Sequence, residues 1–81
     1  MAATAAEWVS RLADRFGTSV PSEEELQALL ALAGEAAHAS ERTAAPISCW
    51  LAARAGLAPA EALEVARQLA AELRGGPPAG E

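Results

Sequence analysis

The chain has 81 residues, of which 11 are acidic and 6 are basic, and its net charge is −5. This length accommodates one domain, and the acidic balance argues against nucleic acid and anionic membranes as partners, because basic side chains supply most of the affinity for both. The single cysteine forms no intrachain disulfide, and no apolar run approaches the ~18 residues of a membrane-spanning helix. With no signal-peptide pattern at the N-terminus, we expect a cytoplasmic protein.

Alanine is the most abundant residue and determines how large a core this chain can build. It occupies 23 positions, and it favours helices while contributing little apolar surface. A chain of this size buries only about 60% of the surface of its unfolded form. We therefore expect modest stability and either a homodimer or a protein partner. The absence of lysine beside abundant arginine and alanine is typical of a GC-rich genome.

The first predicted helix spans residues 5–16 and ends at Gly17, which suits a left-handed closing position. Pro21 keeps the following link out of a helix. Residues 1–4 are expected to fray. The apolar side chains of this helix recur at helical spacing and predict a buried stripe: Trp8, Val9, Leu12 and Phe16.

The second predicted helix has the clearest start signal, a capping box formed by Ser22 and Glu25, and it runs to about Ser40. Leu32 lies off its apolar stripe and suggests a second contact surface. Gly34, inside the helix, suggests close approach by another helix or backbone. The residues expected in the buried stripe are Leu26, Leu29, Leu30, Ala33 and Ala37.

Two shorter helices follow a predicted loop at residues 41–45. Pro46 suits the first turn of the third helix, which ends at Gly56. Its side chains separate into one group formed by Ile47, Trp50 and Leu51 and an opposite side that carries Cys49, expected to be partly buried.

Residues 57–59 open the fourth helix, with proline again early, and residues 75–81 are expected to form a disordered tail. Residues 1–74 are thus predicted to be one all-α domain, a small four-helix bundle-like or orthogonal fold. The apolar stripe of the fourth helix is Leu63, Ala66, Leu69, Ala70 and Leu73.

The residues that stand out chemically are His38, Glu41, Arg42 and Trp50. One interpretation is structural: Arg42 serves the carbonyls that end the second helix, Glu41 accepts the first N–H groups of the third, and His38 packs beside the buried stripe. The other interpretation is a notch at residues 38–42 that binds an anion or a loop of a partner. Trp50, like Trp8, is expected to anchor the core, although tryptophan is also common at interaction hot spots.

Several site chemistries are poorly supported. One histidine and one cysteine cannot complete a closed zinc site without other ligands, and Cys49 has no evident base to activate it. No glycine-rich loop is available to hold a phosphate, since the glycines lie mainly at helix ends and in the tail. We therefore expect no catalysis, no metal and no cofactor.

The sequence resembles a small uncharacterised actinobacterial helical domain that occurs alone or as the C-terminal extension of molybdenum cofactor guanylyltransferases. Those enzymes make molybdopterin guanine dinucleotide. The similarity extends nearly to Arg74, and its most specific part lies between His38 and Pro46. The matching segments are Glu7-Trp8-Val9-x-x-Leu12, the run Leu29–His38, Glu41-Arg42-x-x-Ala45-Pro46, and Leu51-Ala52 followed by Gly56.

The resemblance implies an accessory role and no nucleotide transfer, because the glycine-rich nucleotide loop of those enzymes is missing here. We expect a non-enzymatic accessory or protein-interaction domain, with a guanylyltransferase as the implied partner. The alternative is a domain that binds a small molecule or anion through His38, Glu41 and Arg42. An interaction domain should expose an apolar patch, whereas a ligand-binding domain should enclose a cavity lined by these polar residues.

Overall fold

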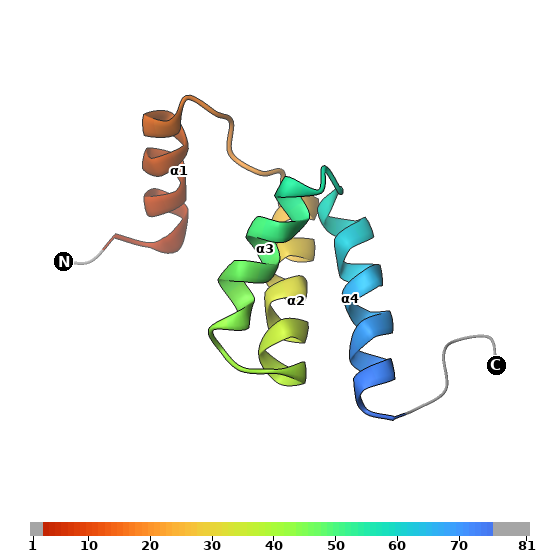
Figure 1. Cartoon of the computed structure of the whole chain (residues 1–81). Helices are drawn as coiled ribbons and strands as arrows, with labels where there is room; N and C mark the ends of the chain where they lie inside the picture. Colours follow the sequence, from red (N-terminus) through yellow and green to blue (C-terminus); the bar gives the residue numbers. More distant parts are fainter. Residues whose placement is uncertain (1–2, 76–81) are drawn as a thin grey trace.

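The computed structural model describes residues 3–75, which form four α-helices joined by short links (Figure 1). The predicted all-α fold with four helices is confirmed, and no strand occurs among the residues described. Only Gly75 of the predicted tail is described, and residues 1 and 2 of the segment expected to fray also lie outside the described part. The helices are α1 (Ala5–Phe16), α2 (Glu23–Ala39), α3 (Ala44–Arg54) and α4 (Pro59–Leu73).

Local hydrogen bonds fix the first residues of α1 and α2. The Ser22 hydroxyl accepts from the N–H of Glu25 at 3.1 Å, and the Glu25 carboxylate accepts from the N–H of Ser22 at 2.8 Å, which confirms the predicted capping box. Thr4 and Glu7 form a second box with the same distances. Its signal, threonine three residues before glutamate, is present in the sequence but did not enter the prediction. The N–H of Thr4 stabilises the charged carboxylate and lowers the pKa of Glu7.

The end of α1 and the start of α3 follow from the backbone. Gly17 ends α1 in the left-handed region with φ 72°, as predicted, and the N–H of Thr18 donates to the carbonyl of Ala13 at 2.9 Å. Pro46 lies in the first turn of α3, but the helix begins at Ala44, inside the predicted loop.

The core lies where α2 contacts α3 and α4, and its buried side chains are Leu32, Ala52 and Ala62, one from each helix. The predicted stripe of α2 is correct for Leu26, Leu29, Ala33 and Ala37, which are half-buried, and wrong for Leu30; the second contact surface suggested by Leu32 is present. Leu32, expected off the stripe, is only 3% exposed, whereas Leu30, expected within it, is 59% exposed. Two helices contact α2 from different sides, and their alanines leave space for one leucine between them.

The predicted stripe on α4 is correct for its small residues and wrong for two leucines. Ala70 is buried, and Leu63 and Ala66 are half-buried, but Leu69 and Leu73 are more than half exposed. The alanine side of α4 packs against α2, while α3 barely contacts α4 and leaves the leucine side uncovered.

Gly34 in α2 does not mark the close approach that the sequence suggested. A Cβ atom built on this glycine would meet no neighbouring atom within 4 Å. The position therefore accepts a side chain, and the glycine only weakens the helix locally.

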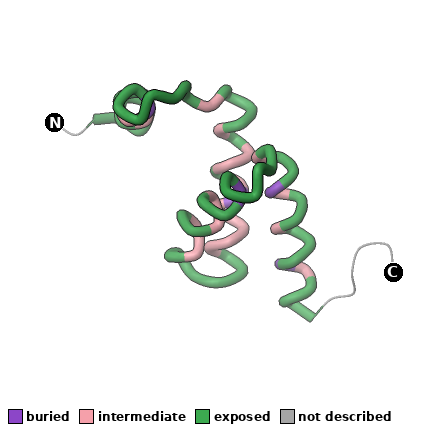
Figure 2. Tube along the Cα trace, turned by 45° about the horizontal axis from the view of Figure 1, so that its top comes forward, coloured by how far each residue is buried: buried purple, intermediate pink, exposed green. Residues whose placement is uncertain are grey.

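Helix α1 stands apart from the other three helices, at the end of the link that precedes α2 (Figures 1 and 2). Within the described residues, no Cα atom of α1 lies within 8 Å of a Cα atom in another helix. Trp8, predicted to anchor the core, is 62% exposed, and Phe16 is also exposed. Val9 and Leu12 are half-buried, so the predicted stripe of α1 is partly covered, although no other helix of the described residues packs against it.

Candidate functional site

The α2–α3 junction carries three of the four residues singled out by the sequence. His38 lies in the last turn of α2, and Glu41 and Arg42 lie in the turn before α3. All three are exposed. They are neighbours in the chain, and because all three are exposed, nothing in the described part of the chain encloses them.

The predicted structural role of Glu41 and Arg42 side chains is not observed. Within the described part of the chain, neither forms a side-chain hydrogen bond, and the ion pair found there joins Arg67 to Glu35 instead. Backbone carbonyls do the work assigned to the carboxylate: those of Glu41 and Arg42 accept from the N–H groups of Ala44 and Ala45 at 2.9 and 3.1 Å. A tight turn satisfies these donors without any side chain.

Trp50 lies in the second turn of α3, and its position corrects the expectation of a core anchor. The ring is 57% exposed, and its helix neighbours Ile47 and Leu51 are exposed to a similar degree. The sequence grouped these three residues correctly on one side of the helix, but that side faces solvent. We call Ile47, Trp50 and Leu51 the α3 face.

The opposite side of α3 is the side that packs. Ala52 is buried, and Cys49 is half-buried against the core that Leu32 helps to form. Burial raises the pKa of the Cys49 thiol, which favours its protonated form at neutral pH. Because alanine and cysteine are small, this side of α3 approaches α2 closely while the bulky side chains remain outside.

Arg54 borders the α3 face, one turn beyond Trp50. Its guanidinium carbon lies 5.1 Å from the centre of the Trp50 ring, within the range of a cation–π interaction. The face therefore combines an apolar centre with a positive charge at its edge.

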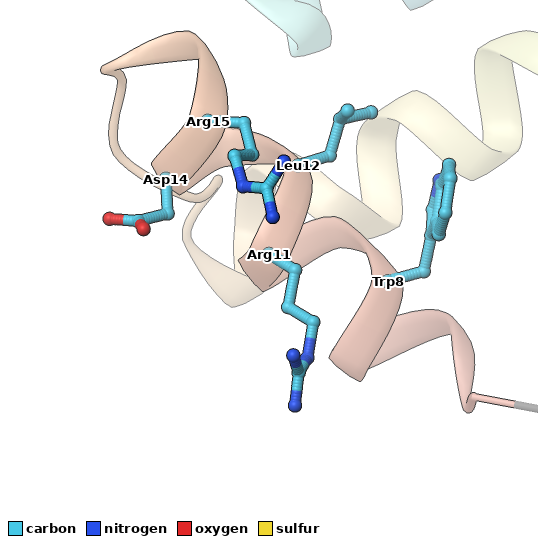
Figure 3. A pocket seen from close by; sticks show the side chains of 5 residues that line it. All are labelled: Trp8, Arg11, Leu12, Asp14 and Arg15. Atoms are coloured by element: carbon cyan, nitrogen blue, oxygen red, sulfur yellow. The ribbon is translucent and has the colours of Figure 1, made fainter.

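Two surface hollows lie elsewhere, and none of His38, Glu41, Arg42 and Trp50 lines them. One, of about 270 Å³, lies between α1, the link and the start of α2, and apolar side chains including Val9, Val20 and Leu26 line it. The other, of about 430 Å³, lies on α1 (Figure 3). Its lining residues are Trp8, Arg11, Leu12, Asp14 and Arg15.

The arginines of α1 are site features that the sequence interpretation left out. Arg11 and Arg15 each follow an apolar stripe residue, Trp8 and Leu12, by three positions, so they border the stripe along one edge. Asp14 projects away from Trp8 and Leu12 (Figure 3). The available signal was the same helical spacing that identified the stripe.

Residues 3–75 offer no candidate for two other kinds of site. No cluster of three or more histidine, cysteine, aspartate or glutamate side chains there could hold a metal ion. Nor does any helix in that range have the length and apolar character to cross a membrane.

The fold and its surface define a small all-α domain with exposed apolar helix faces. The chain belongs to the family described as "Domain of unknown function (DUF6457)", whose model matches residues 1–78. Comparisons with curated proteins and with solved structures found no match.

Proposed function

We propose that this chain is a non-enzymatic, cytoplasmic protein-interaction domain that docks a partner through the α3 face. The observation that carries the proposal is the exposure of three large apolar side chains, Ile47, Trp50 and Leu51, on one side of a single helix. Apolar side chains left in water do not contribute to the burial that stabilises a fold. Contiguous apolar patches of this kind are typical of interaction surfaces.

The chemistry of the α3 face suits a helix-in-groove contact. Its residues follow the spacing of one helical side, at positions i, i+3 and i+4, which is the pattern of anchors that enter an apolar groove. Tryptophan is the residue type most often found to dominate binding energy at such contacts. Arg54 adds a charge at the rim, where it can select a partner with an acidic edge.

The partner we propose is a molybdenum cofactor guanylyltransferase from the same organism. The support is the resemblance to helical domains that occur alone or fused to those enzymes. A domain fused in some chains and separate in others is expected to contact the same enzyme in both arrangements. Its role would be accessory, in the maturation of molybdopterin guanine dinucleotide.

The anion-binding alternative has less support. His38, Glu41 and Arg42 are all exposed, and the hollows found among the described residues lie elsewhere. A buried ligand site would need these groups to converge in a cavity. Titration of the chain with orthophosphate, followed by NMR shifts of residues 38–42, tests this alternative separately.

Calorimetric titration of the chain into the purified guanylyltransferase tests the proposal. Trp50→Ala should weaken binding by at least about 30-fold, the equivalent of a hot spot worth 2 kcal/mol. Leu30→Ala is the control, since it removes an equally exposed apolar side chain from a different helix that belongs to neither proposed interface, and it should bind as the wild type does. No binding by the wild type, or equal losses in both variants, would contradict the proposal.

A further inference from the structure

Helix α1 and the outer side of α4 are two further apolar surfaces without a partner, and neither belongs to the α3 face. α1 presents Trp8, Leu12 and Phe16, and the outer side of α4 presents Val65, Leu69 and Leu73. The three α4 residues, like Trp8 and Phe16, are more than half exposed, and Leu12 is half-buried. We propose that these two surfaces bind each other between two copies of the chain, so that α1 of each copy packs against α4 of the other.

The two surfaces match in shape. Each consists of three large apolar side chains at a spacing of four residues, and each therefore extends about 12 Å along its helix. Rows with this spacing form the ridges that interdigitate in the commonest class of helix packing. The outer side of α4 thus offers α1 a groove of the same length and period.

The charges beside the stripes are complementary and select α4 as the partner surface. Arg11 and Arg15 border the stripe of α1, whereas Glu61 and Glu72 lie within one helical turn of Val65 and Leu69 on α4. The α3 face instead carries the cation of Arg54, which repels a basic helix. Opposite charges at the rim favour one pairing over the other.

A second copy fits these surfaces better than the chain's own α4 does. In both views α2 and α3 lie between α1 and α4, and the link of residues 17–22 holds α1 on the far side (Figures 1 and 2). An isolated helix of 12 residues is marginal in water, so α1 needs an external contact. A two-fold arrangement supplies that contact to both copies at once, since each contributes one α1 and one α4.

Sedimentation equilibrium of the full chain is the first test. We expect twice the chain mass of 8.3 kDa at micromolar concentration, and a monomer at 100-fold higher concentration would overturn the proposal. Leu69→Ala, which removes an apolar contact without altering charge, should raise the dimer dissociation constant at least about 10-fold. Trp50→Ala should leave the dimer intact, so failure of partner binding and failure of dimerisation are separate results.

A charge exchange then shows whether the contact lies between chains. One variant carries Arg11→Glu and Arg15→Glu, and the other carries Gln68→Arg and Glu72→Arg; Glu61 is kept because its carboxylate accepts from the N–H of Ala58. Each variant alone faces like charges and should be monomeric. Mixed, they should form a heterodimer in which both α1–α4 contacts pair opposite charges. Failure of the mixture to associate, or dimerisation of either variant alone, would contradict the proposal that α1 of one copy packs against α4 of the other.

Discussion

The guanidinium group of Arg54 lies over the exposed ring of Trp50, with its central carbon 5.1 Å from the ring centre. A cation–π contact at an exposed site contributes about 0.5–1 kcal/mol. The contact adds little to the stability of the fold, but it restricts the orientations of the indole. A side chain that is already oriented loses less entropy when a partner covers it. The pair therefore presents Trp50 in a form suited to binding.

The core depends on one leucine, and its replacement should show this. Leu32→Ala is expected to lower the free energy of unfolding by about 2–5 kcal/mol, because Leu32 is the large side chain buried between α2, α3 and α4. Leu30→Ala, on the same helix but mostly exposed, should cost less than about 1 kcal/mol. Urea unfolding followed by circular dichroism compares the two variants. Equal losses would mean that α2 does not pack as described.

Gly34→Ala should stabilise the chain by about 1 kcal/mol. The added Cβ meets no atom within 4 Å, and alanine is a better helix former than glycine. For a chain of this size, the melting temperature should rise by about 4–8 °C. A lower melting temperature would contradict the open surroundings of this position and would indicate that something packs against it.

The start of α2 should depend on its capping side chain, whereas the start of α3 should not. Ser22→Ala removes the hydroxyl that accepts from Glu25 and should cost about 1 kcal/mol. Thr43 occupies the same position before α3 but forms no capping hydrogen bond through its side chain. Thr43→Ala is therefore the control, and its unfolding midpoint in denaturant should barely change. A larger loss for Thr43→Ala than for Ser22→Ala would contradict the assignment of a capping side chain to α2 and of none to α3.

Arg42→Ala should leave stability within about 0.5 kcal/mol of the wild type, the usual range for surface substitutions. The reason is that the side chain is exposed and forms no ion pair among the described residues, while backbone carbonyls bond the first N–H groups of α3. Thermal unfolding measures the difference. A loss of several kcal/mol would restore the structural role that the sequence suggested.

Apart from the start of α3, the sequence predicted helix limits well, because helix ends are set by neighbours in the chain. Ser22 and Glu25 act within the first turn of α2, and Gly17 directly follows the last turn of α1. Both helix ends appear in the structure as expected. The side that each helix buries depends instead on distant segments. Leu30 and Leu32 have similar intrinsic properties, and only the approach of α3 and α4 to α2 distinguishes them.

The same limit applies to the candidate site. The spacing of Ile47, Trp50 and Leu51 predicted one group of side chains, but an apolar group on an amphipathic helix normally faces the core. In α3 the small residues Cys49 and Ala52 pack instead. The sequence could not show that close contact through small residues would leave the bulky side exposed.

The chain contains only two tryptophans, so ¹⁹F NMR of the chain labelled with 5-fluorotryptophan tests the central claim most directly. The resonances of Trp8 and Trp50 can be assigned with Trp50→Phe, and the purified guanylyltransferase is then added. We expect the Trp50 resonance to shift or broaden in proportion to the enzyme bound, while the Trp8 resonance keeps its chemical shift. A shift at Trp8 with none at Trp50, or no change at either, would contradict docking through the α3 face.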